Sequence, residues 1–150
     1  MRYKVIYISL LCLTFIWCII ILLAPYFKSI NHSSSIFIYF FFSKICHQLP
    51  ERSFYFCGEK LAVCQRCTAI YFSFFIGVVF YPLIRKINYT KLRYFFYISI
   101  IIIVIDFLFG YIGILQNKFT ILISGSLFGI GSSYLITSVL LVTNKNKTEN

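Results

Sequence analysis

Four of the six cysteines in this chain and one of its two histidines fall within residues 46–67. Thiolate and imidazole are the ligand types of structural zinc sites, and the same thiolates suit iron or copper(I). Thiolates also attack disulfides, so these residue types allow either a metal site or a redox centre. The residues concerned are Cys46, His47, Cys57, Cys64 and Cys67.

Cys64 and Cys67 stand three positions apart, immediately before an apolar segment that begins near Thr68. If that segment is helical, its first turn brings both sulfurs to one face. There the free backbone N–H groups and the helix dipole favour thiolate over thiol. Arg66 adds positive charge between them. The pair is therefore suited to metal binding and to disulfide exchange, and its spacing does not choose between the two.

A tetrahedral zinc site would take three of the cysteines, Cys46, Cys64 and Cys67. Either Cys57 or His47 would complete it, and we favour His47. Because adjacent residues rarely both reach one small ion, only one of Cys46 and His47 is expected to be a full ligand. In an oxidising compartment the four cysteines would instead form two disulfides, or a redox pair with an exchange partner. We favour the metal site, with zinc preferred and iron or copper as alternatives.

The composition of the chain is that of a membrane protein. Its hydrophobic fraction is 60% and its charged fraction is 12%, against roughly 45–50% and about 25% in soluble domains. Four apolar segments are long enough to cross about 30 Å of hydrocarbon as helices. They lack the alternation of barrel strands, so helices are the available solution. The segments are residues 5–24, 68–84, 94–115 and 119–142.

The expected fold is all-α, an integral membrane bundle of four transmembrane helices that forms a single domain over residues 1–143. A cysteine-rich loop at about residues 43–68 connects the first two helices. Within that connection, residues 36–42 are apolar but too short to span, and they predict a short interfacial helix. Residues 5–24 are too long for a signal-peptide core, so we expect them to stay as the first helix. Residues 144–150 are expected to form a disordered polar tail.

Lysine and arginine beside the helix ends predict the orientation. They gather at the N-terminus, in the connection after the second helix and in the tail. These three regions are therefore expected on the cytoplasmic side, and the cysteine loop on the other. The net charge of +10 then reports topology and attraction to anionic lipid, without nucleic acid as a partner. The basic residues are Arg2, Lys4, Arg85, Lys86, Lys91, Arg93, Lys145 and Lys147.

Two features inside the expected spans bear on function. Asp106 is the only acidic residue there, and an ionised carboxylate at a helix centre costs about 2.5–3.5 kcal/mol. It could orient a ligand, relay a proton or line an ion path. We favour a protonated carboxyl bonded to a Ser, Thr or Tyr of a neighbouring helix. The spacing Gly125-x-x-x-Gly129 permits close helix contact, either within the chain or with a homo-oligomer or membrane partner.

The cysteine segment resembles a known family. It is similar to the small membrane proteins of domain of unknown function family 2085, specifically over about residues 46–77 and more loosely through Asp106 and the glycines of the last helix. The resemblance implies a membrane location and Cys46, His47, Cys64 and Cys67 as the functional set, without a fixed counterpart of Cys57 and without an assigned reaction. The matching residues read Cys46-His47-Gln48 with Pro50, Arg52-Ser53-Phe54, then Cys64-x-Arg66-Cys67-Thr68-x-Ile70-Tyr71 and Gly77.

Three functions remain open at this point. The first is a metal-binding membrane protein with its site at the membrane surface. The second is a membrane thiol-disulfide oxidoreductase that uses Cys64 and Cys67, with Cys46 or Cys57 as exchange partner. The third is a structural scaffold subunit whose small-residue helix face recruits a partner. Whether the protein is an enzyme does not follow from these residues.

Overall fold

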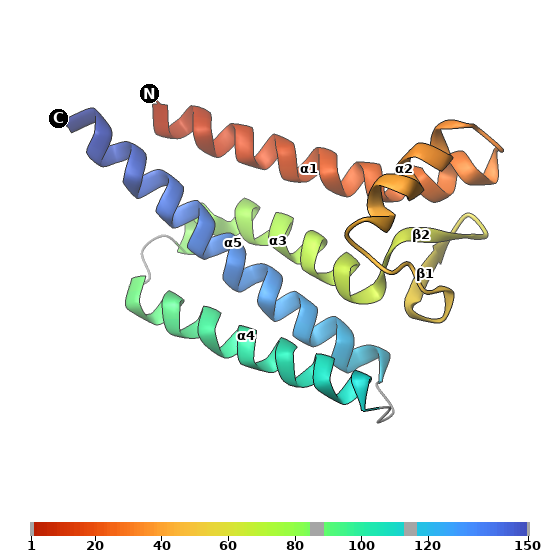
Figure 1. Ribbon diagram of the computed structural model, residues 1–150. Coiled ribbons are helices and arrows are strands. Elements are labelled where there is room, and N and C mark those ends of the chain that lie inside the picture. The colour runs from red at the N-terminus through yellow and green to blue at the C-terminus, as the bar shows by residue number, and fades with distance from the viewer. Residues whose placement is uncertain (1, 85–88, 113–116, 150) are drawn as a thin grey trace.

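A computed structural model describes residues 2–84, 89–112 and 117–149. Arg85 and Lys86, which contribute to the expected orientation, lie outside these residues, as does the end of the span expected at residues 94–115. Within the described ranges the chain forms a helical bundle with one small hairpin (Figure 1). The long helices are α1 (Arg2–Ser29), α3 (Gln65–Ile84), α4 (Tyr89–Tyr111) and α5 (Lys118–Glu149).

Each long helix contains a stretch that is apolar and long enough to cross a membrane. The all-α class and the four candidate spans are therefore confirmed. The helix α3 begins at Gln65, three residues before the expected start, so Cys67 belongs to its first turn. The candidate spans are Lys4–Ser29, Gln65–Leu83, Thr90–Tyr111 and Lys118–Leu141.

Small residues let α5 lie directly against α3, with α4 on its other side (Figure 1). A methyl group placed on Gly125 would come within 3.0 Å of the Arg66 carbonyl oxygen, and one on Gly129 would overlap the Ile70 carbonyl oxygen. The glycine face is therefore filled by α3 of the same chain. Of the two alternatives expected for this glycine spacing, the structure thus shows the contact within the chain, and contact with a homo-oligomer or membrane partner stays a prediction.

The helices α1 and α4 flank this central pair. The Tyr7 hydroxyl of α1 donates a hydrogen bond to the Val78 carbonyl of α3 at 2.9 Å, which satisfies a polar group inside an apolar bundle. Large apolar side chains cover the outward faces, with Leu13 63% exposed and Ile101 58% exposed. Such faces suit contact with the lipid bilayer, where apolar surface carries no hydration cost.

The segment expected as a cysteine-rich loop contains ordered structure. After α2 (Ser34–Ser43), the 3₁₀ turn η1 (Pro50–Arg52) leads into an antiparallel hairpin of β1 (Ser53–Phe56) and β2 (Glu59–Cys64). Cys57 and Gly58 both adopt positive φ angles, 52° and 78°, as a two-residue type I′ turn requires. Aromatic and β-branched residues on either side of that turn favour strands. We call residues 34–64 the cap.

The cap packs on the end of α1 through a small core. Phe42 and Val63 are fully buried there against Ile21 of α1. Polar contacts add to this packing, because Lys28 of α1 forms an ion pair with Glu59 at 2.7 Å. The expected short apolar helix is present as α2, and its location in the membrane interface stays a prediction.

The two termini and the end of α3 lie at one end of the bundle, whereas the cap lies at the other (Figure 1). The orientation prediction places the termini and the end of the second span on one side of the membrane and the cysteine segment on the other, and the observed placement agrees with this. The compartment that each end faces stays a prediction. The helix α5 continues past its candidate span to Glu149, so the backbone of residues 144–149 is helical. The disorder expected for this polar tail and the single-domain boundaries also stay predictions.

Candidate metal centre

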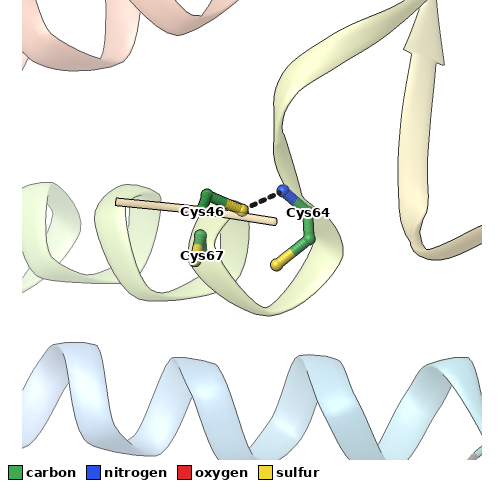
Figure 2. Close-up of side chains that lie close together, drawn as sticks. All are labelled: Cys46, Cys64 and Cys67. Carbon is green, nitrogen blue, oxygen red and sulfur yellow. Dashed lines mark hydrogen bonds between the residues drawn. The ribbon is translucent and has the colours of Figure 1, made fainter. Parts of the chain in front are cut away.

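Three cysteine sulfurs meet where the cap joins α3. The Sγ atoms of Cys46, Cys64 and Cys67 all lie within 4.8 Å of one another (Figure 2). Thiolates bound to one zinc ion at about 2.3 Å in a tetrahedral arrangement are about 3.8 Å apart. The three sulfurs therefore need to approach one another by only about 1 Å to share an ion. Three close cysteines in this arrangement could hold a metal ion.

Two separate segments supply these sulfurs. Cys46 follows α2, and its backbone N–H donates at 2.9 Å to the Phe42 carbonyl in the last turn of that helix, which fixes its position beside α2. Cys64 is the last residue of β2, and Cys67 lies in the first turn of α3. The strand-to-helix junction therefore holds the C-x-x-C pair, while the segment after α2 places Cys46 beside it.

Hydrogen bonds to the Cys46 sulfur favour its thiolate form. Its sulfur accepts the backbone N–H of Cys64 at 3.1 Å (Figure 2). The pKa of Cys46 is held well below its usual value, first by hydrogen bonds from the Cys64 and Cys67 side chains and then by backbone N–H groups of Cys64 and Gln48. The same interaction with Cys46 raises the pKa of Cys64. The Cys64 N–H group thus donates to a sulfur from another segment, and the thiolate expected on Cys64 stays a prediction.

Polar contacts position the segment that carries Cys46. The Gln48 side-chain amide donates to the Tyr39 carbonyl at 2.8 Å, and Lys60 Nζ donates to the Gln48 carbonyl at 3.0 Å. The Tyr39 hydroxyl in turn donates to the Lys60 carbonyl. These contacts join α2, the Cys46 segment and β2 into one unit. Sequence reasoning missed this role of Gln48, although it lies directly after Cys46-His47.

The other two candidate ligands lie outside the triad. His47 is exposed and borders the neighbouring cavity, but its ring is not among the mutually close donor atoms. Cys57 is exposed at the hairpin turn. Because β2 is six residues long and a strand rises about 3.3 Å per residue, the turn lies roughly 20 Å from Cys64. The hairpin therefore keeps Cys57 away from the three sulfurs.

Asp106 has a charged partner that sequence reasoning did not assign to it. Arg66 Nη2 lies 2.6 Å from Asp106 Oδ2, and the two side chains are 19% and 9% exposed. The Arg66 guanidinium carbon also lies 5.7 Å from the Phe107 ring centroid. This differs from the expected protonated carboxyl bonded to a hydroxyl. The earlier start of α3 places Arg66 inside the bundle, where it meets α4.

A cavity of about 390 Å³ adjoins the three sulfurs. The triad and His47 form part of its wall, and the side chains of Arg52 and Arg66 border it as well. The remaining wall is apolar. Arg66 Nε is buried without a hydrogen-bond partner among the described residues. The candidate metal centre thus opens onto a space with cationic and apolar sides.

Comparisons with known proteins agree with the sequence resemblance. The family described as predicted membrane protein, domain of unknown function family 2085, matches residues 46–135, from the first sulfur of the triad into α5. An uncharacterized protein of Methanocaldococcus jannaschii is 39% identical over 103 residues, which cover 65% of this chain and 66% of that protein. An uncharacterized protein of Methanothermobacter thermautotrophicus is 43% identical over 49 residues, or 33% of this chain and 43% of the relative.

The chain thus spans just under two thirds of the first relative and less than half of the second. No solved structure matches it. The family match covers all three cysteines of the triad, the candidate spans Gln65–Leu83 and Thr90–Tyr111, and most of Lys118–Leu141. This chain belongs to the predicted membrane proteins of domain of unknown function family 2085.

Proposed function

We propose that this membrane protein binds a metal ion, preferably zinc, through Cys46, Cys64 and Cys67. The observation that carries the proposal is the convergence of three sulfurs from two segments within 4.8 Å. Thiolates are soft ligands that bind zinc well. Because zinc imposes no strong geometric preference, it can bind three sulfurs that need only a small movement to share one ion. The N–H group of Cys64 on the Cys46 sulfur supports the same role, because such second contacts orient thiolate ligands.

The metal identity and the fourth ligand extend this proposal. Iron and copper(I) suit the same thiolates, and their presence would depend on supply in the cell. His47 borders the cavity beside the triad, so it stays the protein's own candidate for the fourth position. Asp106 of α4 has an indirect role in this proposal. Its carboxylate fixes the side chain of Arg66, which lies between Cys64 and Cys67 in the sequence.

The test is metal analysis of protein purified in mild detergent from zinc-replete cells. We expect about one zinc ion per chain. Replacement of any triad cysteine by serine should lower the zinc content at least tenfold, because serine is a poor zinc ligand. Matched controls are Cys12→Ser and Cys57→Ser, since both cysteines are exposed away from the triad. Metal-free wild-type protein, or equal zinc in all variants, would refute the proposal.

A second candidate function is disulfide exchange by the same sulfurs. Because all three lie within 4.8 Å of one another, side-chain rotation can bring two of them to the bond length of about 2.05 Å while the third stays as an exchange partner. Two thiols would form one disulfide, giving two electrons and two protons to an acceptor disulfide, which becomes a dithiol. Thiol counting after mild oxidation tests this function. Reversible loss of two thiols among the triad, in protein that carries no zinc, would favour it over metal binding.

We also propose that the cap faces the non-cytoplasmic side and that both termini face the cytoplasm. The charge distribution of the sequence supports this orientation. Cys57 provides a natural reporter, because it is exposed at the hairpin turn. A membrane-impermeant maleimide should label it in intact cells, and Cys57→Ser should abolish that label. Labelling that requires disruption of the membrane would reverse the orientation.

A further inference from the structure

We infer that the metal in this site keeps its fourth coordination position open to the adjoining cavity, where it accepts a small anion that carries an apolar group, such as a short-chain carboxylate. This inference rests on the proposed metal site and names the class of ligand that the site would take. It differs from a closed structural zinc site, in which four protein ligands exclude exchangeable ones.

The first observation is the number of protein donors in place. Among the residues that the structure describes, the triad supplies three sulfurs, and no fourth His, Cys, Asp or Glu donor joins them. His47, the natural candidate, is exposed. Zinc sites with three protein ligands typically leave one position for water or a substrate. The triad therefore has the composition of an open site.

The second observation is the space beside the triad. The cavity of about 390 Å³ is bordered by all three cysteines, and ligand sites in proteins commonly measure about 300–1,000 Å³. A small organic molecule therefore has room to reach the metal.

The third observation is the charge on the cavity wall. Arg52 and Arg66 both border the cavity, and no carboxylate among the described residues does. Arg66 is held in place by Asp106 at 2.6 Å, and its Nε is buried without a partner in the described part of the chain. Arg52 forms no ion pair in that part. Guanidinium groups bind carboxylates in a bidentate manner, so the wall favours an anion over a neutral or cationic ligand.

The fourth observation is the apolar remainder of the wall. Ile45, Leu49, Phe107 and Ile121 border the same cavity. Ile121 is buried, whereas the other three are also exposed on the outer surface. An apolar group on the anion would pack against the parts of these side chains that face the cavity, which an inorganic anion would leave uncovered. The cavity thus combines a metal position, cationic groups and an apolar surface, which together select an amphiphilic anion.

The test uses reduced full-length protein in detergent with cobalt(II) in place of zinc. The ligand-field and thiolate-to-cobalt absorption bands then report the coordination. Azide should shift the ligand-field bands while the thiolate bands remain, because an anion joins the three sulfurs. Hexanoate should bind at least tenfold more tightly than acetate, since each buried methylene tightens binding by roughly three- to fourfold.

Matched variants separate the groups involved. Arg52→Gln should weaken hexanoate binding by about tenfold, as expected for loss of one charged hydrogen-bonding partner. Arg52→Lys should lose less, because it retains the charge. Lys44→Gln, which removes an exposed cation outside the cavity wall, should leave the affinity unchanged. His47→Ala should retain cobalt and the azide response, since this inference gives the fourth position to an exchangeable anion in place of the imidazole.

The outcomes distinguish the inference from the proposal beneath it. Failure to bind cobalt overturns both. Two results would overturn the open position without contradicting the metal site. In the first, cobalt binds with thiolate bands but does not respond to azide or hexanoate. In the second, His47→Ala loses the fourth ligand. Equal affinity for acetate and hexanoate overturns the amphiphilic class.

Protein in nanodiscs with and without oleate then identifies the source of the anion. If oleate blocks azide binding, the ligand is a membrane amphiphile. If azide binding is unchanged and hexanoate still binds, the ligand is a water-soluble carboxylate.

Discussion

The interface between α3 and α5 and the cap at the end of the bundle are stabilised in different ways. At the interface, glycines bring two backbones so close that an added methyl at Gly129 would overlap Ile70. In the cap, a short helix and a two-stranded hairpin surround a small core, and three sulfurs stand at its junction with α3. The interface is complete from protein atoms alone, whereas the cap ends in a cluster of groups suited to an ion.

This difference indicates that the two regions respond to different perturbations. Close helix packing depends on side-chain volume, so a single added methyl group is enough to disturb it. A two-stranded hairpin is marginally stable by itself and needs additional support. Here that support comes from packing on α1, from polar contacts and, in our proposal, from a bound metal. The ion pair of Arg66 with Asp106 links the two regions, because Arg66 belongs to the junction and Asp106 to α4.

The largest expected effect comes from metal removal. Treatment of the reduced protein with a strong chelator should raise amide hydrogen exchange in residues 46–67 by about a hundredfold or more, because in our proposal the metal joins the Cys46 segment to the start of α3 and its binding free energy stabilises that junction. Exchange in residues 124–133 of α5 should stay within about threefold. Exchange measured by mass spectrometry checks both segments. An equal increase in the two segments would contradict their independence.

The next effect comes from the ion pair that links the regions. Asp106→Asn leaves the Arg66 charge without its partner, and because Asp106 is 9% exposed in its side chain, the loss should be about 3 kcal/mol of unfolding free energy. Unfolding in mixed detergent micelles measures it.

The double variant Arg66→Met with Asp106→Leu is the control for this prediction. It removes both charges and should recover more than half of the loss. If the double variant is as unstable as the single one, the destabilisation does not come from an uncompensated charge.

A smaller effect comes from a single methyl at the helix interface. Gly129→Ala would meet the Ile70 backbone and should cost about 1–3 kcal/mol. Gly131→Ala is the matched control, because its methyl would meet the Ser99 hydroxyl oxygen of α4 at 3.0 Å, whereas the methyl at Gly129 would overlap the Ile70 carbonyl oxygen. We expect the smaller overlap to cost less unfolding free energy than Gly129→Ala. Equal unfolding free energies for the two variants would show that α3 and α5 are less closely packed than described.

The smallest effect comes from the ion pair between the cap and α1. Lys28 and Glu59 lie 2.7 Å apart, but their side chains are 45% and 33% exposed. Solvent screening therefore limits the contribution, and Glu59→Gln should lower the unfolding free energy by at most about 0.5 kcal/mol. Zinc content should not change. A loss comparable to that of Asp106→Asn would mean that the cap is anchored mainly by this pair.

Much of the architecture was predictable from residue patterns. Long apolar runs predicted all four spans, because the bilayer sets the length that a helix must have. The C-x-x-C spacing before an apolar run predicted that Cys64 and Cys67 lie together. The hairpin was harder to predict, because its strands are short and a Cys-Gly pair is a weak turn signal.

Other parts of the site depended on contacts between distant segments. The partner of Asp106 was not predictable, since Arg66 lies 40 residues away along the chain and its place inside the bundle follows from the start of α3. The acceptor of the Cys64 amide was not predictable either, because Cys46 reaches it from another segment. Local spacing carries no information about such pairs.

The sequence by itself determined that this protein is a four-helix membrane protein with a cluster of soft ligands near one end of the bundle. Composition and run length suffice for that, since they respond to the bilayer and to local helix geometry. Only the tertiary structure decided which cysteines meet, that Cys57 is held apart at a hairpin turn, and that Gly125 and Gly129 contact α3 of the same chain. These outcomes depend on how the segments pack in three dimensions, where the position of one backbone fixes the neighbours of another.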